Sequence, residues 1–126
     1  MAIIGIGTDI VKVSRINRLI KKYPLGFAER ILHENEFKKF KKHKMKDSFV
    51  SKRFAGKEAV AKALGTGIAQ GVAFKEIEIS NDANGQPVLI LHGKTLEIAQ
   101  NRGVVKNYIS LSDELKYAIA YVILEG

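Results

Sequence analysis

Apolar and polar positions alternate with two different periods along this chain, and the change of period separates a helical first half from a strand-rich second half. Residues 3–9 form an apolar run with glycines at positions 5 and 7, which predicts a short strand that another backbone approaches closely. Helical spacing then predicts helices over residues 12–22, 25–32 and 34–42, the first of them ended by Tyr23-Pro24.

A longer helix is predicted up to residue 64. Asp47 or Ser48 can cap its N-terminus, and the Gly65-Thr66-Gly67 turn ends it. A helix of this length spans roughly 26 Å, which is enough to cross a small domain. The apolar positions expected to be buried are Phe49, Val50, Phe54, Val60, Ala61 and Leu64. We therefore expect this to be the central helix of the domain.

Strand patterns dominate the second half. They predict strands over residues 74–79, 87–91, 107–112 and 116–124, a hairpin turn at Asn84-Gly85 and one helix over residues 94–102. The last strand is apolar at consecutive positions, which predicts a central strand covered on both faces. The expected fold class is α+β, with a mainly antiparallel sheet packed around the long central helix in a single domain of residues 1–126.

Length and composition narrow the picture further. The 126 residues, 46% of them hydrophobic, suffice for one domain with a real core. The absence of cysteine excludes a disulfide framework, thiolate metal sites and a cysteine nucleophile. The N-terminus does not resemble a signal peptide, and no apolar run reaches transmembrane length. We therefore expect a cytoplasmic protein with no membrane association.

The net charge of +8 favours an acidic partner, such as nucleic acid, an anionic membrane, a phosphate-bearing small molecule or an acidic protein. Residues 38–46 hold six lysines and His43, and this run is either a solvated helix end or a phosphate contact. A basic nucleic-acid-binding module is the alternative reading. Against it, the chain has no tryptophan, only 8% aromatic residues and no nucleic-acid motif, so we expect no nucleic-acid partner.

Two carboxylates stand where apolar residues would be easier to explain. Asp9 ends the first apolar run, and Glu58 lies in the long helix among apolar and basic positions. Glu58 and Lys62 are four residues apart, which also fits an ordinary helix ion pair worth about 0.2–0.5 kcal/mol. If the first strand packs beside the helix, the two carboxylates repel each other, and a divalent cation is a common resolution. A non-catalytic structural subunit would leave their placement unexplained.

Basic and glycine residues around this pair fit a phosphate ligand. Arg53, Lys57 and Lys62 could neutralise phosphate oxygens, and the Gly65-Thr66-Gly67 turn could offer backbone N–H groups, although a plain helix C-cap explains it equally well. Neither a Walker-type loop nor a complete dinucleotide fingerprint is present. The histidines at positions 33, 43 and 92 are scattered and lack metal-ligand spacing.

Taken together, these segments resemble the holo-[acyl-carrier-protein] synthase family of 4′-phosphopantetheinyl transferases. The resemblance rests on residues 5–11 (GIGTDIV) with Arg15-Ile16, on residues 27–32 (FAERIL), on residues 52–67 (KRFAGKEAVAKALGTG) and on residues 84–87 (NGQP). It covers nearly the whole chain, and the segment 52–67 is its most specific part, because acid, lysines and glycines all fall in register.

The resemblance implies an activity and assigns roles. A serine of apo-acyl carrier protein attacks coenzyme A, takes up 4′-phosphopantetheine and releases adenosine 3′,5′-bisphosphate, in support of fatty acid biosynthesis. Asp9 and Glu58 look like Mg²⁺ ligands, and Lys62 looks like the residue that stabilises charge on the transferring phosphate. The coenzyme A site would include Arg53, Lys57, Gly65, Thr66 and Gly67, with Lys44, Lys46 and Pro87 as further contacts.

The resemblance also implies a homotrimer with sites between subunits, so that Asp9 and Glu58 face residues of a neighbouring chain. Arg15, Arg18 and Lys22 share one helix face, which is a plausible docking surface for the acidic acyl carrier protein, or simply a solvated face. One departure concerns the general base: Asp113 stands where some members carry a histidine. Glu58, Asp113 or a metal-bound water remain the candidates for taking the serine proton.

Overall fold

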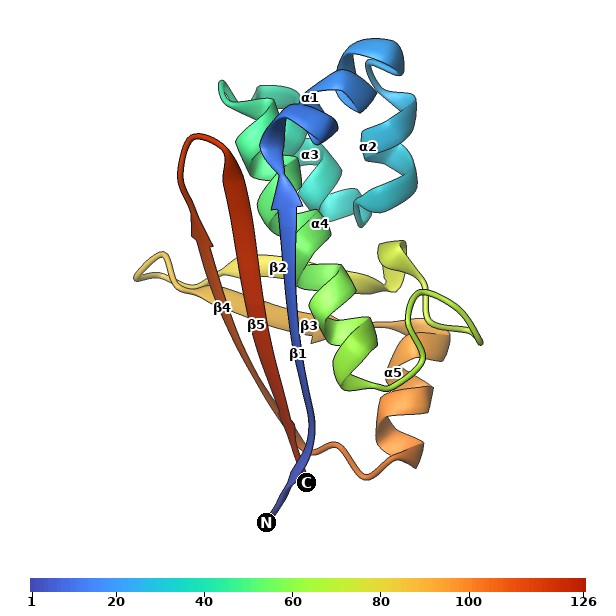
Figure 1. Cartoon of the computed structure of the whole chain (residues 1–126). Coiled ribbons are helices and arrows are strands. Elements are labelled where there is room, and N and C mark those ends of the chain that lie inside the picture. Colours follow the sequence, from blue (N-terminus) through green and yellow to red (C-terminus); the bar gives the residue numbers. More distant parts are fainter.

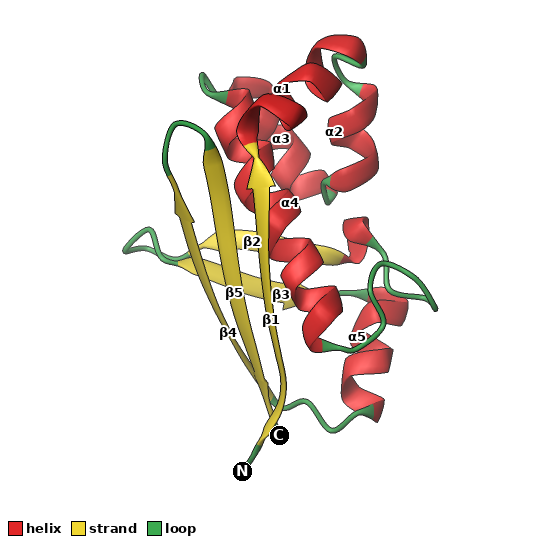
Figure 2. Cartoon of the chain, viewed as in Figure 1, coloured by secondary structure: helices red, strands yellow, loops and turns green.

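The computed structural model describes residues 1–126 and confirms the α+β class, with antiparallel sheets arranged around one long helix (Figures 1 and 2). The elements in chain order are β1 (Ile3–Lys12), α1 (Val13–Lys22), α2 (Gly26–Ile31), α3 (Glu34–Lys42), α4 (Lys46–Ala63), the 3₁₀ helix η1 (Phe74–Glu76), β2 (Ile77–Asn81), β3 (Pro87–Leu91), α5 (Gly93–Asn101), β4 (Lys106–Asp113) and β5 (Tyr117–Glu125).

The strands form two sheets rather than one. The larger sheet has the order β1-β5-β4, and the β2–β3 hairpin forms a separate pair. Helix α4 contacts strands of both sheets, as expected of the central helix. Helices α1, α2 and α3 gather at one end of the molecule and α5 lies toward the other, where the two termini meet (Figure 1).

The glycines of β1 allow the strand to lie directly on α4. A Cβ atom at Gly5 would collide with the carbonyl group of Ala63, and one at Gly7 would collide with that of Ala59. The close approach expected from these glycines is therefore present. It sets Asp9, two residues beyond Gly7, beside the helix that carries Glu58.

Helix α4 is buried around most of its circumference, because a sheet lies on each side of it and α1 and α3 also pack against it. Its apolar residues, among them Val50, Ala59, Val60 and Ala61, are fully buried together with Leu64 just beyond its end. A helix enclosed in this way must bury some polar positions as well, and Ser51, Arg53 and Lys57 are buried. No helix combines the length and the apolarity needed to cross a lipid bilayer.

Two local expectations about helix α4 and strand β1 are corrected. Strand β1 continues to Lys12, so Asp9 lies within the strand rather than at its end. The N-cap of α4 is Met45, without a side-chain cap, because the Asp47 carboxylate instead accepts hydrogen bonds from the Ser48 backbone N–H and the Asn17 side chain.

Strand β5 is central in its sheet, as predicted, but cover on both faces is wrong for the single chain. Its residues alternate between buried alanines and valine on the α4 side and exposed side chains on the other. The outward side chains of Tyr117, Ile119 and Tyr121 are 39%, 43% and 45% exposed. The apolar run therefore reflects a second face that the chain itself leaves open.

Candidate functional site

Asp9 of β1 and Glu58 of α4 lie on neighbouring elements, and Lys62 of α4 joins the two elements. Lys62 Nζ lies 3.0 Å from Asp9 Oδ1 and also donates to the Thr8 carbonyl oxygen at 3.0 Å. Lys62 therefore pairs with Asp9 across two elements, and no ion pair joins it to Glu58 on its own helix. The ordinary helix ion pair is thus not what these residues form.

The surroundings of Glu58 disfavour its charged form. Partial burial raises the pKa of the Glu58 carboxyl, and the nearby negative charge of Asp9 raises it further, while Lys62 and Arg15 oppose the shift. A divalent cation between the two carboxylates would relieve this repulsion. Carboxylate oxygens are the donors that hard cations such as Mg²⁺ take, so the residues present fit such an ion.

Lys57, in contrast, points into the core. Its side chain is fully buried, and its ammonium group donates to Glu36 Oε1 and to the carbonyl oxygens of Phe74 and Ile77. Burial lowers the pKa of Lys57, and the carboxylate of Glu36 partly restores it. A direct contact of Lys57 with coenzyme A is therefore not supported, since all three of its hydrogen bonds are made inside the chain.

The partner Glu36 was not singled out from the sequence. In sequence it reads as one charge among many on an amphipathic helix, yet its side chain is 2% exposed. Glu36 also accepts from the backbone N–H groups of His33 and Ile79, and it lies 3.5 Å from Arg53 Nε. Only the packing of α3 against α4 and β2 reveals this anchor.

The Gly65-Thr66-Gly67 turn is a helix C-cap. The Gly65 N–H donates to the Lys62 carbonyl oxygen, and the N–H groups of Thr66 and Gly67 both donate to that of Ala61. Gly65 and Gly67 adopt φ angles of 79° and 65°, which glycine tolerates without strain. Because these three N–H groups are already used, the turn does not offer them to an anion.

Other predicted contacts gather at a separate polar cavity of about 260 Å³. Arg53 and Pro87 line it together with His43, Lys52, Asn81 and Asp113. The Arg53 guanidinium lies over the Phe49 ring and donates to Asn81 Oδ1 at 3.4 Å. Nearby, Lys46 Nζ donates to the His43 carbonyl oxygen, while Lys44 is exposed.

Asp113 belongs to this second cavity and not to the acidic pair. Its carboxylate accepts a hydrogen bond of 2.7 Å from Ser48 Oγ and lies 3.8 Å from Lys52 Nζ. Within one chain, the predicted site residues therefore fall into two groups. One holds Asp9, Glu58 and Lys62, and the other holds Arg53, Pro87 and Asp113.

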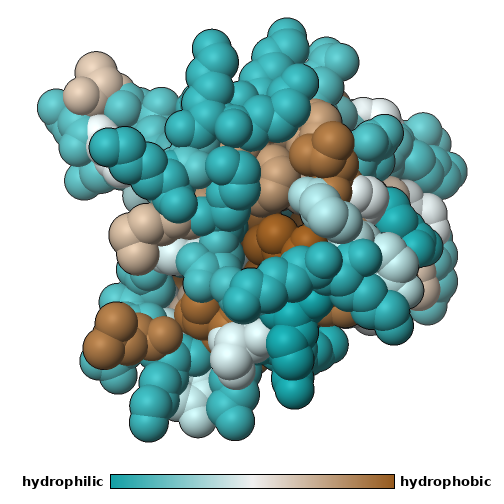
Figure 3. Space-filling view, turned by 90° about the horizontal axis from the view of Figure 1, so that it is seen from above, coloured by the Kyte–Doolittle hydropathy of each residue, from teal (hydrophilic) through white to brown (hydrophobic).

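The basic face of α1 is exposed, as expected. Arg15, Arg18 and Lys22 all face solvent, and the charge of Arg15 reaches Glu58. Beside them lies an apolar hollow of about 490 Å³, lined by Leu19, Tyr23, Gly26, Phe27, Arg30, Ile31 and Phe74. Seen from above, this end of the molecule is largely hydrophilic, with smaller apolar areas between the polar side chains (Figure 3).

Comparison with known proteins gives consistent matches over the whole chain. Residues 5–122 match the profile of the 4′-phosphopantetheinyl transferase superfamily. The holo-[acyl-carrier-protein] synthase of Aliivibrio fischeri is 49% identical over 126 residues, covering 100% of both chains. The crystal structure of the Neisseria meningitidis synthase matches with a TM-score of 0.94 at 41% identity, covering 99% of this chain and 100% of that one.

A second solved structure contains a ligand. The holo-(acyl-carrier-protein) synthase of Bacillus anthracis, in complex with coenzyme A (3′,5′-ADP), matches with a TM-score of 0.82 at 40% identity. The match covers 97% of this chain and 96% of that one.

Proposed function

Since the chain belongs to the 4′-phosphopantetheinyl transferase superfamily, as a holo-[acyl-carrier-protein] synthase, we propose that it transfers 4′-phosphopantetheine from coenzyme A to apo-acyl carrier protein in a Mg²⁺-dependent reaction. The serine Oγ forms a bond to the β-phosphorus, the bond from that phosphorus to the bridging oxygen breaks, and adenosine 3′,5′-bisphosphate leaves. The observation that carries the proposal is the convergence of Asp9, Glu58 and Lys62 from two elements.

The residues of the acidic pair have distinct tasks in this reaction. Asp9 and Glu58 would hold Mg²⁺, which when bound neutralises charge on the phosphates of coenzyme A. Lys62, exposed and already beside Asp9, can swing its ammonium group toward phosphate oxygens. As acceptor of the serine proton we propose Glu58 or a metal-bound water rather than Asp113, because the Asp113 carboxylate faces Ser48 and Lys52.

We further propose that the chain works as a homotrimer with active sites between subunits. The outward face of the larger sheet is apolar, with Ile6, Ile10, Ile119 and Tyr121 exposed. An exposed apolar face of this kind is typical of an interface. When a neighbouring subunit covers this face, the cavity of Arg53, Pro87 and Asp113 on one subunit would face Asp9 and Glu58 on the next. Each group would then be a half-site, and two half-sites from different subunits would form one coenzyme A site.

Acyl carrier protein would dock on α1. The exposed cations Arg15, Arg18 and Lys22 complement an acidic partner, and the adjoining hollow around Leu19 and Phe27 can take an apolar side chain of it. Because Arg15 also acts on Glu58, a partner bound to this face would present its serine close to the acidic pair.

The test is a transfer assay with coenzyme A, Mg²⁺ and apo-acyl carrier protein, read by mass spectrometry of the carrier. We expect the carrier to gain one phosphopantetheine. Asp9→Ala and Glu58→Ala should each lower kcat by about 10²-fold or more, because each removes charge stabilisation from the transition state. Gln100→Ala, at an exposed position of α5 away from all the predicted site residues, serves as a comparison that should change kcat much less.

A carrier protein that gains no mass under any metal condition would refute the proposed activity. Full activity of both carboxylate variants, with circular dichroism showing native folding, would instead refute the metal assignment. Replacing Mg²⁺ by Mn²⁺ in the same assay identifies the preferred ion.

A further inference from the structure

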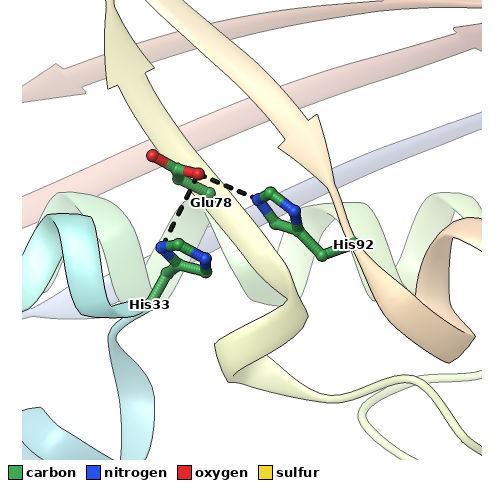
Figure 4. A group of neighbouring side chains, drawn as sticks. All are labelled: His33, Glu78 and His92. Atoms are coloured by element: carbon green, nitrogen blue, oxygen red, sulfur yellow. Dashed lines mark hydrogen bonds and ion pairs between the residues drawn. The ribbon is translucent and has the colours of Figure 1, made fainter.

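Two histidines that are far apart in the sequence lie against each other in the fold (Figure 4). The rings of His33 and His92 stack with their centroids 4.5 Å apart. Glu78 Oε1 lies 2.9 Å from His92 Nε2 and 3.6 Å from His33 Nδ1. Spacing along the sequence does not indicate this cluster, because its three residues come from three separate segments.

We propose that His33, Glu78 and His92 form a binding site for a divalent transition-metal ion such as Zn²⁺, apart from the Asp9–Glu58 pair. One ligand atom from each of the three side chains lies within 4.8 Å of the other two. Two imidazole nitrogens and one carboxylate oxygen are a donor set that suits Zn²⁺, whereas Mg²⁺ prefers oxygen donors alone. This site does not depend on the proposed transfer reaction.

The separations are close to those that an ion requires. At metal–ligand distances of about 2.0–2.2 Å, the ligand atoms of a tetrahedral site are roughly 3.3–3.5 Å apart. The distances from Glu78 Oε1 to the two rings, 2.9 Å and 3.6 Å, bracket this range. A shared ion also requires the two rings, which stack 16° from parallel with their centroids 4.5 Å apart, to turn until both lone pairs aim at one point.

Asn35 holds the cluster in place. Its side-chain amide donates to Glu78 Oε2 at 3.2 Å, which leaves Oε1 facing the two rings. Outer hydrogen bonds of this kind orient ligands in metal sites. The Asn35 backbone N–H donates to His33 Nδ1 at 3.1 Å, so an ion on Nδ1 would replace one hydrogen bond at the start of α3.

The location is accessible and joins separate parts of the molecule. The side chain of His92 is 39% exposed, whereas that of Glu78 is 7% exposed, so an ion can enter from the His92 side and keep a water as fourth ligand. His33 precedes α3, Glu78 lies in β2 and His92 follows β3. A bound ion would tie the helical end to the small sheet and stabilise the folded chain.

The experiment titrates the full chain with Zn²⁺ by calorimetry and thermal melting, and with Co²⁺ by visible absorption. We expect one ion per chain, a rise in Tm of about 5–10 °C at roughly hundredfold excess over Kd, and a tetrahedral Co²⁺ spectrum. His92→Gln and His33→Gln should each weaken binding by about tenfold or more, since even losing an outer partner costs about 10–100-fold. His43→Gln removes the histidine outside the cluster and should leave Kd unchanged.

Asp9→Ala separates the two candidate cation sites. If the proposal holds, this variant still binds Zn²⁺ with unchanged affinity. The proposal is overturned by the absence of saturable binding, by equal affinity in His92→Gln and His33→Gln, or by loss of binding in Asp9→Ala alone.

Discussion

At the scale of single residues, the neighbouring charged side chains Lys57 and Glu58 of α4 differ in burial and in their ion-pair partners. Lys57 is fully buried and has all its partners inside the chain. Glu58, next in sequence, is half-buried beside the like charge of Asp9, and the charges of Lys62 and Arg15 oppose that repulsion. The first arrangement stabilises the fold, whereas the second leaves a charge that a bound cation would stabilise.

Replacing Glu58 by glutamine should therefore stabilise the metal-free protein while removing transfer activity. Because the folded chain raises the pKa of Glu58 above 4.5, the ionised form opposes folding at neutral pH. That penalty disappears as the pH falls below the ordinary carboxyl pKa, where Glu58 is protonated in both states. We expect Glu58→Gln to raise Tm by about 1–3 °C at pH 7, and the gain to vanish near pH 4. Lower stability of Glu58→Gln at pH 7 would contradict this account.

Lys57→Met should destabilise the folded chain, in contrast to Glu58→Gln. It leaves the buried carboxylate of Glu36 without its closest cation, and removing one partner of a buried pair typically costs about 3–5 kcal/mol. Urea unfolding measures this loss. Because Lys57 has no exposed atoms for a ligand, KM for coenzyme A of the folded protein should remain unchanged, and a large rise in that KM would restore the direct contact inferred from the sequence.

At the scale of elements, the site depends on how closely β1 lies on α4. The carbonyl groups of Ala59 and Ala63 occupy the space that side chains at Gly7 and Gly5 would need. This backbone contact fixes the distance between the strand that carries Asp9 and the helix that carries Glu58. The glycines therefore shape the acidic pair without contributing a functional group to it.

Gly7→Ala tests this spacing. The added methyl group meets helix backbone, so the strand must move, and we expect a loss of about 2 kcal/mol or more with a lower kcat. Gly26→Ala is the matched control, because its Cβ would have no neighbour closer than 3.8 Å. It should change the free energy of unfolding by less than about 1 kcal/mol. Equal effects of the two substitutions in urea unfolding would refute the spacing argument.

At the scale of the whole molecule, one chain presents two separate groups of polar residues, which we propose to be half-sites, and an open apolar sheet face. The rows Ile10–Ile119 and Ile6–Ile123 pair across β1 and β5 on that outward side. Such a face rarely remains open on a monomer. One assembly step would therefore both bury the sheet and bring the half-sites of neighbouring chains together.

Ile119→Lys should break this assembly, because it places a charge in the middle of the face. We expect analytical ultracentrifugation to show monomers, with transfer activity lost although the fold persists. Leu96→Lys on α5, with comparable exposure of 37%, should remain assembled and active. Activity in a monomeric Ile119→Lys protein would show that one chain contains the complete site.

Mixing Asp9→Ala with Arg53→Met chains tests independently whether one active site takes Asp9 and Arg53 from different subunits. Each variant alone should be inactive. After unfolding and joint refolding, about a quarter of the sites in a closed ring would combine an intact Asp9 with an intact Arg53 from the neighbour. No recovery of activity would place both residues in a site within one chain.

The sequence by itself determined the elements and the acidic pair. Periodicity located the α-helices and strands to within a few residues, because amphipathic patterns and turn residues are local properties. The exception is the 3₁₀ helix Phe74–Glu76, which the sequence predicted as the start of a strand. The residues of segment 52–67 pointed to Glu58 and Lys62, and the glycines of β1 pointed to a close backbone contact that the structure confirms.

Only the tertiary structure decided which charged residues lie in the core and which remain free. Lys57 and Lys62 look alike in sequence, yet one is fully buried on Glu36 and the other reaches Asp9. His33 and His92 lie against Glu78 for the same reason, since α3 and the β2–β3 hairpin meet only after folding. Burial and ion pairing depend on contacts between distant segments, and no local pattern in the sequence carries that information.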